Sequence, residues 1–350
     1  MVERCPDKTE VEGSIPSTRT KMSYELFFYI FLLVVGVIAL IKSGFYAVRS
    51  LISIAHFLNI SEFSAAFILM AIATSLPELG IGVNAALNKA PLISLGNILG
   101  ANILVLSFVF GLMILIDGNF KIKKHSPAHS SWLNFFLAIS PIVFLFDGEL
   151  SRLDGLILIS LFGVNLARLF KFKAIFHNHH RFWPSFVSHF ENRPDGLKIS
   201  YFFKNFLIFV VSVGILLFSA YLIVRSVNAV SLRFGLPQML IGIFAVALGT
   251  TLPELSFGIK AALSRHEEMS LGNLLGTVVF NSTWILGIVS LISPIKITEP
   301  ISFWISAVTM VLVIFLANLF LKSRDSLNRW EGAFLILIYL VFVVVQIIWR

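Results

Sequence analysis

Apolar residues run along this chain in ten long blocks and do not alternate with polar ones. Each block is about as long as a helix that crosses the hydrocarbon core of a bilayer, which needs roughly 20 residues. Strands of a membrane barrel would alternate apolar and polar positions, so the pattern predicts helices instead. The predicted spans are residues 25–52, 62–88, 92–116, 129–147, 152–170, 203–231, 237–262, 268–293, 301–322 and 328–349.

The composition indicates the same class of protein. Of the 350 residues, 57% are hydrophobic and only 13% are charged, and the mean hydropathy is +0.89. So few charged residues cannot cover the surface of a soluble domain of this size. We therefore predict an all-α polytopic membrane protein with ten transmembrane helices. A single cysteine, Cys5, excludes an internal disulfide, and no Cys/His spacing indicates zinc, so we expect no cofactor.

Lysine and arginine are distributed unevenly between the two ends of the predicted helices. With the N-terminus outside, 14 of them fall on the cytoplasmic side and ten on the other side, including the N-terminal tail. The positive-inside rule therefore predicts both termini outside, and we expect the protein in the plasma membrane. The same rule and the anionic inner leaflet account for the net charge of +8, so we expect a lipid bilayer and no nucleic acid as partner.

The chain contains an internal duplication. When it is shifted by 176 positions, so that residue 74 meets residue 250, residues 74–105 align with 250–281 without a gap and 15 of the 32 positions are identical. Five spans precede the basic loop and five follow it, and an odd number per half turns the second copy upside down. We therefore predict two inverted five-helix repeats. The predicted organisation is a polar tail at 1–22, a first repeat at 23–170, a basic cytoplasmic loop at 171–202 and a second repeat at 203–350.

A short phrase occurs once in each repeat, inside a membrane-spanning segment. A carboxylate near the centre of a membrane helix costs roughly 3 kcal/mol, which indicates a function. Each proline lacks an N–H group, so we expect its helix to kink or break there and to leave carbonyl oxygens unpaired where lipid cannot hydrogen-bond to them. The phrase therefore brings carboxylate, hydroxyl and carbonyl oxygens together. It reads Thr74-Ser75-Leu76-Pro77-Glu78 in the first repeat and Thr250-Thr251-Leu252-Pro253-Glu254 in the second.

Two such phrases facing each other suit a hard divalent cation. Ca²⁺ takes roughly six to eight oxygen ligands, and two bidentate glutamates would supply about four of them. Two carboxylates also neutralise one divalent ion, which lowers the cost of burying it. Soft transition metals prefer sulfur and nitrogen ligands, which the phrase lacks. A proline kink beside a protonated glutamate is the alternative for either copy alone, and the matched duplication argues against it.

The two phrases and the segments after them resemble a known family. TSLPEL followed by SLGNILGANI, and TTLPEL followed by SLGNLLGTVVFN, resemble the α-repeats of the cation/Ca²⁺ antiporter superfamily, whose best-known branch is the sodium/calcium exchangers. The α-repeats would lie at about 62–116 and 237–293. The resemblance implies transport of Ca²⁺ and a coupling monovalent cation. It implies Glu78 and Glu254 as the principal Ca²⁺ ligands, with oxygens of Thr74 and Thr250, and a Na⁺ site that uses Ser75, Thr251, Ala71, Ala247 and Thr277.

The chain departs from the exchanger pattern after each second glycine. The family motif runs Gly-Ser-Asn-x-x-Asn/Asp, whereas the first repeat keeps only the earlier asparagine, Asn102, and the second keeps only the later one, Asn281. We expect both asparagines in the cation site. Asn281 stands opposite Val105 in the alignment, and Ala101 replaces the hydroxyl residue. Fewer oxygens then remain for Na⁺, so exchange of Ca²⁺ for protons stays open as an alternative.

The predicted function is a secondary active antiporter that works by alternating access. The first and sixth helices would move against the rest of the bundle, and a monomer is sufficient. A cation channel would use the same oxygens without obligatory exchange. An intramembrane enzyme fits less well, because acid and base catalysis need different groups on the two sides. A histidine cluster in the basic loop could bind a regulatory metal, although a solvated loop is the simpler interpretation: His177, His179 and His180.

Overall fold

The computed structural model describes residues 16–57, 72, 74–121, 131–169, 196–263, 267–323 and 326–349. Helices dominate this part of the chain, and its short π-helical and 3-10 segments carry the label η. The helical elements are α1 (Pro16–Phe57), α3 (Leu76–Leu87), α4 (Pro91–Leu104), η1 (Val105–Val109), α5 (Phe110–Asp117), α6 (Ser131–Phe144), η3 (Leu145–Asp147), α7 (Arg152–Leu169), α9 (Gly196–Phe234), α10 (Gln238–Ile241), η4 (Gly242–Val246), α11 (Ala247–Thr250), α12 (Leu252–Leu263), α13 (Glu267–Val279), η5 (Phe280–Ile285), α14 (Leu286–Ile292), α15 (Pro300–Ser323) and α16 (Arg329–Ile348). The strands are β1 (Asn119–Lys121), β2 (Glu149–Leu150), β3 (Ile295–Lys296) and β4 (Ser326–Asn328).

The helices have the length and composition of membrane spans. Within the described residues, six continuous helices are long and apolar enough to cross a membrane, and two shorter apolar helices lie at Trp132–Asp147 and Gln238–Thr250. The fifth predicted span is α7, whose charged residues lie at its two ends. The described part of the second span is α3. The predicted all-α membrane class is therefore confirmed.

Two helices extend beyond their predicted spans. α1 already begins at Pro16, whereas the polar tail was predicted to reach residue 22. α9 begins at Gly196, inside the segment predicted as a basic loop. Hydropathy marks only the part of a helix that lies in hydrocarbon, and a helix continues past it until the backbone is broken. The histidine cluster at 177–180 and the start of the second span at 62–71 lie outside the described residues.

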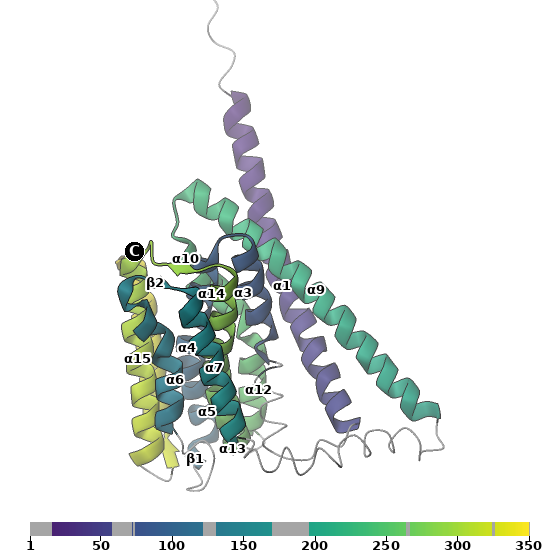
Figure 1. The fold of residues 1–350 in the computed structure, drawn as a ribbon, viewed down its shortest axis with the longest axis vertical. Coiled ribbons are helices and arrows are strands. Elements are labelled where there is room, and N and C mark those ends of the chain that lie inside the picture. Colours follow the sequence, from purple (N-terminus) through teal and green to yellow (C-terminus); the bar gives the residue numbers. More distant parts are fainter. Residues whose placement is uncertain are drawn as a thin grey trace, which may run out of the picture.

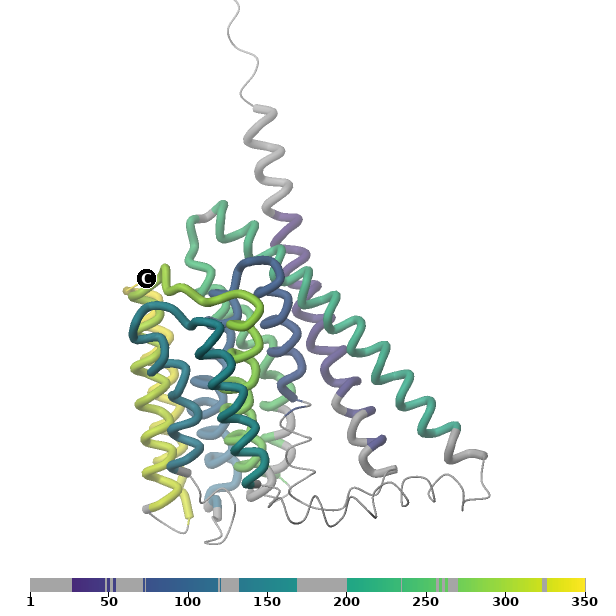
Figure 2. The backbone as a smooth tube through the Cα atoms, in the orientation of Figure 1, coloured from purple at the N-terminus to yellow at the C-terminus, as the bar shows by residue number. Residues whose placement is uncertain are grey.

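The two repeats interlock as an inverted pair. α7 of the first repeat packs against α14 of the second, and its counterpart α16 packs against α5 of the first. α6 packs against its own counterpart α15, and α1 packs against its counterpart α9. Figure 2 shows teal helices of the first repeat beside green and yellow helices of the second. These reciprocal contacts are those of two repeats related by a two-fold axis.

Pairs of glycines make the same close contact in both halves. A Cβ atom added at Gly155 of α7 would stand 2.8 Å from the carbonyl oxygen of Gly287 in α14. A Cβ atom added at Gly332 of α16 would stand 2.7 Å from the carbonyl oxygen of Gly111 in α5. Gly111 and Gly287 are equivalent in the duplication. Small residues allow membrane helices to approach this closely, and a larger side chain would force the backbones apart.

A short two-stranded sheet closes each end of the bundle. β1 pairs antiparallel with β4, and β2 pairs antiparallel with β3. Each sheet joins one strand from each repeat, and Figure 1 places β1 at the lower end of the bundle and β2 at the upper end. Neither sheet was predicted from the sequence, because strands of two or three residues are too short to show a periodic pattern.

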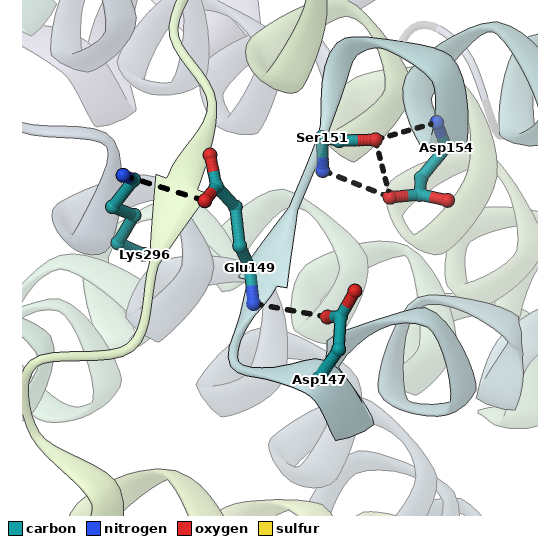
Figure 3. Close-up of polar contacts among 5 residues, drawn as sticks. All are labelled: Asp147, Glu149, Ser151, Asp154 and Lys296. Atoms are coloured by element: carbon teal, nitrogen blue, oxygen red, sulfur yellow. Dashed lines mark hydrogen bonds and ion pairs between the residues drawn. The ribbon is translucent and has the colours of Figure 1, made fainter.

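The acidic turn before α7 is held by contacts with protein groups (Figure 3). Asp154 Oδ2 accepts hydrogen bonds from the Ser151 backbone N–H at 2.9 Å and from the Ser151 hydroxyl at 2.6 Å. Asp147 Oδ1 accepts one from the Glu149 N–H at 3.1 Å. Glu149 also pairs with Lys296 of β3 at 3.4 Å. These carboxylates cap the start of α7 and stabilise the pairing of β2 with β3, so the turn has a structural role.

The equivalent turn before α16 has the same kind of cap. The Asn328 side chain accepts hydrogen bonds from the backbone N–H groups of Trp330 and Glu331, and the Glu331 side chain accepts one from the Asn328 N–H. Such reciprocal capping satisfies N–H groups at the start of a helix that have no intrahelical partner. The inverted repeat therefore extends through the last two helices of each half, beyond the region where the sequences still align.

Glu299, just before α15, ties that helix to the start of α10. Its Oε1 accepts a hydrogen bond from the Gln238 N–H at 2.8 Å, and its Oε2 accepts one from the Met239 N–H at 3.1 Å. Burial raises the pKa of Glu299, although both hydrogen bonds favour its charged form. The folded protein therefore binds this proton more tightly than the unfolded chain. The resulting stability is present below the unfolded pKa and is lost as pH rises through the folded pKa.

Replacing Glu299 with alanine is expected to lower the stability of the folded protein by about 1 kcal/mol, because two N–H groups at a helix start lose their acceptor. Thermal unfolding in detergent would measure the effect. Glu299→Gln keeps one acceptor and should lose less, and it should weaken the dependence of stability on pH. Thr298→Ala changes the exposed neighbouring residue and serves as the control. An unfolding temperature of Glu299→Ala equal to that of the control would contradict the capping role.

Candidate cation site

Both repeats interrupt a helix at the same place in the duplicated phrase. The interrupting residues have nearly identical backbone angles, with φ −86° and ψ 8° at Ser75 and φ −84° and ψ 0° at Thr251. α3 and α12 begin one residue later, and Pro77 and Pro253 are their second residues. Proline is tolerated there because the N–H groups of a first turn have no helical partner. The predicted helix breaks are confirmed.

Glu78 and Glu254 lie in the first turns of the helices that start at these breaks. The unpaired N–H groups and the positive end of the helix dipole favour a negative charge at this position. In the second repeat, α11 ends just before the break, at Thr250, and its last carbonyl groups form the negative end of that helix dipole. At the break of the second repeat, the carbonyl oxygens at the end of α11 therefore lie near the start of α12, whose N–H groups favour the charged form of Glu254.

The two halves of the site face each other across the repeats. Thr250 of the second repeat lies beside the carboxyl group of Glu78, and Thr74 of the first repeat lies beside that of Glu254. The two carboxyl groups are also close enough to interact electrostatically. The structure thus brings together the four residues that the sequence analysis predicted as Ca²⁺ ligands. Whether they bind Ca²⁺ stays a prediction.

The side chains around the breaks are buried, and many of their polar atoms have no hydrogen-bond partner. Both glutamates are 0% exposed. A buried polar atom without a partner costs about 1–3 kcal/mol, and more when it is charged. This many unpartnered polar atoms in one place fit a site in which a bound cation would contact their oxygens. Within the described chain, the unpartnered atoms here are Ser75 Oγ, both Oε atoms of Glu78 and of Glu254, Asn97 Nδ2, both amide atoms of Asn273, Thr277 Oγ1 and Asn281 Oδ1.

Two threonine hydroxyls at the break of the second repeat lie within hydrogen-bond distance of other oxygen atoms of the protein. Thr251 Oγ1 donates to the Ala247 carbonyl oxygen at 2.8 Å, and Thr250 Oγ1 lies 3.1 Å from Asn97 Oδ1 and 3.3 Å from the same carbonyl. Donation leaves the oxygen lone pairs available to a cation. The Ala247 carbonyl itself already accepts these hydrogen bonds. Its predicted counterpart in the first repeat, Ala71, lies outside the described residues.

Packing contacts show which residues lie level with each glutamate. A Cβ atom added at Gly82 of α3 would stand 3.1 Å from the Ile285 side chain of η5. Four residues earlier on these two helices are Glu78 and Asn281. The two helices run in the same direction in the predicted topology, so this glutamate lies level with an amide.

The second glutamate has a different neighbour. A Cβ atom added at Gly258 of α12 would stand 3.3 Å from the Val109 side chain of η1. Four residues earlier on these helices are Glu254 and Val105, and Val105 is fully buried. Since these two helices also run in the same direction in the predicted topology, this glutamate lies level with a valine. The two halves of the site are therefore chemically unequal.

Two π-helical segments flank the glutamates at equivalent positions. η1 begins at Val105 and η5 at Phe280, next to Asn281, so the duplication preserves them. A π-helical turn carries one more residue than an α-helical turn, and such turns are frequent at functional sites. These segments could not be predicted from the sequence, because nothing in the residue pattern distinguishes them from ordinary apolar helix.

Glycines of α4 allow the interrupted helix of the second repeat to lie directly on it. A Cβ atom at Gly96 would collide with the Met239 carbonyl oxygen, and one at Gly100 would collide with that of Ile243. These two glycines therefore serve close helix packing. Asn97, between them, lies 3.1 Å from the Thr250 hydroxyl, so its side chain belongs to the candidate site.

A family comparison agrees with this architecture. The sequence profile described as sodium/calcium exchanger protein matches residues 28–171 and 204–348. The chain belongs to the sodium/calcium exchanger family. The matched blocks coincide with the two repeats and leave out most of the basic segment between them. This exchanger-family protein is therefore a transporter and not an enzyme.

Relatives and solved structures resemble it over most of their length. The sodium/calcium exchanger MaX1 of Methanosarcina acetivorans is 26% identical over 345 residues, which cover 90% of this chain and 97% of that protein. The putative antiporter CaxA of Alkalimonas amylolytica is 28% identical over 314 residues, with 87% and 94% covered. A solved structure of the sodium-calcium exchanger NCX_Mj soaked with Na⁺ and Sr²⁺ matches with a TM-score of 0.61 at 24% identity, over 91% of this chain and 98% of that one. This likeness confirms the fold of ten transmembrane helices in two inverted repeats.

Proposed function

We propose that this exchanger-family protein is a secondary active antiporter that exchanges Ca²⁺ for Na⁺ and holds Ca²⁺ between Glu78 and Glu254. The observation that carries the proposal is a pair of fully buried carboxylates, one from each inverted repeat, whose oxygens lack hydrogen-bond partners. Two adjacent carboxylates repel each other in a medium of low dielectric constant, and one divalent cation or two monovalent ones relieve that repulsion. The site can therefore be loaded with either substrate in turn.

Alternating access would follow from the movement of α1 and α9 across the site. These two helices pack together and lean away from the rest of the bundle (Figure 1). α1 crosses both helix breaks, since a Cβ atom added at Gly44 would stand 3.3 Å from Pro77 Cγ and 3.9 Å from Pro253 Cγ. A shift of this pair would open the site to one side and close it to the other. We place the protein in the plasma membrane with both termini outside.

Exchange of Ca²⁺ for protons is the second candidate. It is favoured by the positions that lack an oxygen ligand, Ala101 and Val105, which are both fully buried. Each missing oxygen weakens a Na⁺ site, whereas a proton needs only one carboxylate oxygen. Two protons on the glutamates would balance the charge of one Ca²⁺. The comparison with Na⁺/Ca²⁺ exchangers supports the first candidate, and the departures from their motif support the second.

Ca²⁺ uptake into sealed vesicles is expected to follow an outward Na⁺ gradient. The reconstituted protein would be given this gradient at clamped pH and, separately, an outward proton gradient without Na⁺. Membrane voltage would be clamped in both cases, and radioactive Ca²⁺ would measure uptake. Uptake driven only by the proton gradient would replace Na⁺ with protons as the coupling ion. Uptake that continues without any opposing gradient would indicate a channel.

A further inference from the structure

One chain of hydrogen bonds crosses between the repeats at the depth of the glutamates. Asn281 Nδ2 donates to Asn102 Oδ1 at 3.2 Å, and Asn102 Nδ2 donates to Ser282 Oγ at 3.0 Å. All three side chains are 0% exposed. Asn102 therefore uses both ends of its amide within the protein, whereas Asn281 uses its NH₂ group and keeps its oxygen unpartnered.

The hydrogen bond between Asn281 and Asn102 has no equivalent between the corresponding residues of the other half of the site. The shift that aligns the repeats maps Asn102 onto Val278 and Asn281 onto Val105. α4 packs against η5, and its counterpart α13 packs against η1. The positions equivalent to the asparagine pair are therefore Val278 and Val105, and both valines belong to the apolar core. One half of the site therefore has two asparagines and the equivalent half has two valines. The two residues of each pair are alike in polarity.

We propose that Asn102 is a positioning residue that turns the amide oxygen of Asn281 toward Glu78 and its cation. The inference rests on the proposed function of the site. An asparagine amide has a donor end and an acceptor end. Because Asn102 holds the donor end of Asn281, the acceptor end is left for the site, and a neutral oxygen is a ligand that Ca²⁺ readily takes. Glu78 then shares its cation with an amide, whereas Glu254 lies level with a valine.

A double-mutant cycle on Ca²⁺ affinity tests this role. Titration calorimetry on the purified protein would give the dissociation constant for Ca²⁺ of the wild type, Asn102→Leu, Asn281→Leu and the double variant. Each single substitution is expected to weaken binding by about five- to tenfold, the effect of one ordinary hydrogen bond or ligand contact. The double variant should bind as Asn281→Leu does, because Asn102 acts only through Asn281.

Additive effects in the double variant would overturn the proposal, as would wild-type affinity in Asn102→Leu. Asn318→Leu is the matched control, because Asn318 is also buried but donates to the Ile314 carbonyl oxygen of its own helix; it should leave Ca²⁺ affinity unchanged. Thermal unfolding of each variant without Ca²⁺ separates a general loss of stability from a loss of affinity. If Asn102→Leu does not fold, Ser282→Ala removes the anchor of Asn102 and should show the same dependence on Asn281.

Failure of the proposed function would look different. It would appear as wild-type protein that binds no Ca²⁺, or as binding that survives Glu254→Gln. Binding that needs Glu254, together with an additive cycle, would leave the proposed function in place and reject only the role of Asn102.

Discussion

Replacing either Glu78 or Glu254 with glutamine is expected to abolish Ca²⁺ transport while the protein still folds and inserts. Glutamine keeps the size of the side chain and removes its charge. One remaining carboxylate would have to hold a divalent cation alone in a fully buried site. Removing one partner of a buried charge pair typically costs about 3–5 kcal/mol, which corresponds to a loss of affinity of roughly 10²- to 10⁴-fold.

Ca²⁺ uptake into vesicles and calorimetric binding would both measure this loss. Glu149→Gln is the matched control, since Glu149 lies on the turn before α7 and pairs with Lys296; it should leave transport unchanged. Equal amounts of folded protein, judged by size-exclusion chromatography, are needed for the comparison. Normal transport by either site variant would show that the cation lies elsewhere.

The approach of the two phrases to each other was predictable from the sequence, because each repeat carries one copy. A phrase that combines proline with a carboxylate is ambiguous in a single membrane helix. Two copies in inverted repeats lie on either side of the two-fold axis that relates the repeats. Two carboxylates that are each costly to bury in the membrane are then expected to face one shared site. The structure agrees, since Thr250 lies beside Glu78 and Thr74 beside Glu254. The helix breaks followed from proline chemistry alone.

The contacts across the site could not be predicted in this way. An alignment of the repeats places Asn281 opposite Val105, but this is equivalence under the two-fold axis and not a contact. In the structure Asn281 contacts Asn102, and the two lie on different repeats at positions that the alignment does not pair. Which residues touch depends on how the helices cross, and the π-helical segments change that geometry locally. No sequence pattern marked those segments.

The two glutamates of the proposed site have different neighbours. In the described part of the chain, no three His, Cys, Asp or Glu side chains are grouped so that they could hold a metal ion, so the proposed site has two carboxylates. Asn281 adds a neutral oxygen near one of them, and Val105 adds none near the other. Binding should therefore depend on both glutamates, although each contributes in a different environment. The same inequality is what the double-mutant cycle on Asn102 and Asn281 is designed to detect.

The second large effect is expected at Gly44, where α1 crosses both helix breaks. A leucine there would place its branched side chain against Pro77 and Pro253, which already lie within contact distance of a single added carbon. If α1 must move across these prolines for the site to change sides, Gly44→Leu should slow Ca²⁺ uptake at least tenfold. Gly44→Ala requires a shift of only a few tenths of an ångström and should have a much smaller effect.

Gly214→Leu gives a matched control, because it adds the same side chain to α9 at a glycine with nothing within 4 Å. Transport by this control should equal that of the wild type. Ca²⁺ binding measured on Gly44→Leu separates two causes of slow uptake. Retained affinity with slow uptake is the expected result, since leucine blocks the movement and leaves the oxygens of the site in place. Uptake at the wild-type rate would mean that α1 does not travel across the prolines, and a different pair of surfaces would then have to open the site.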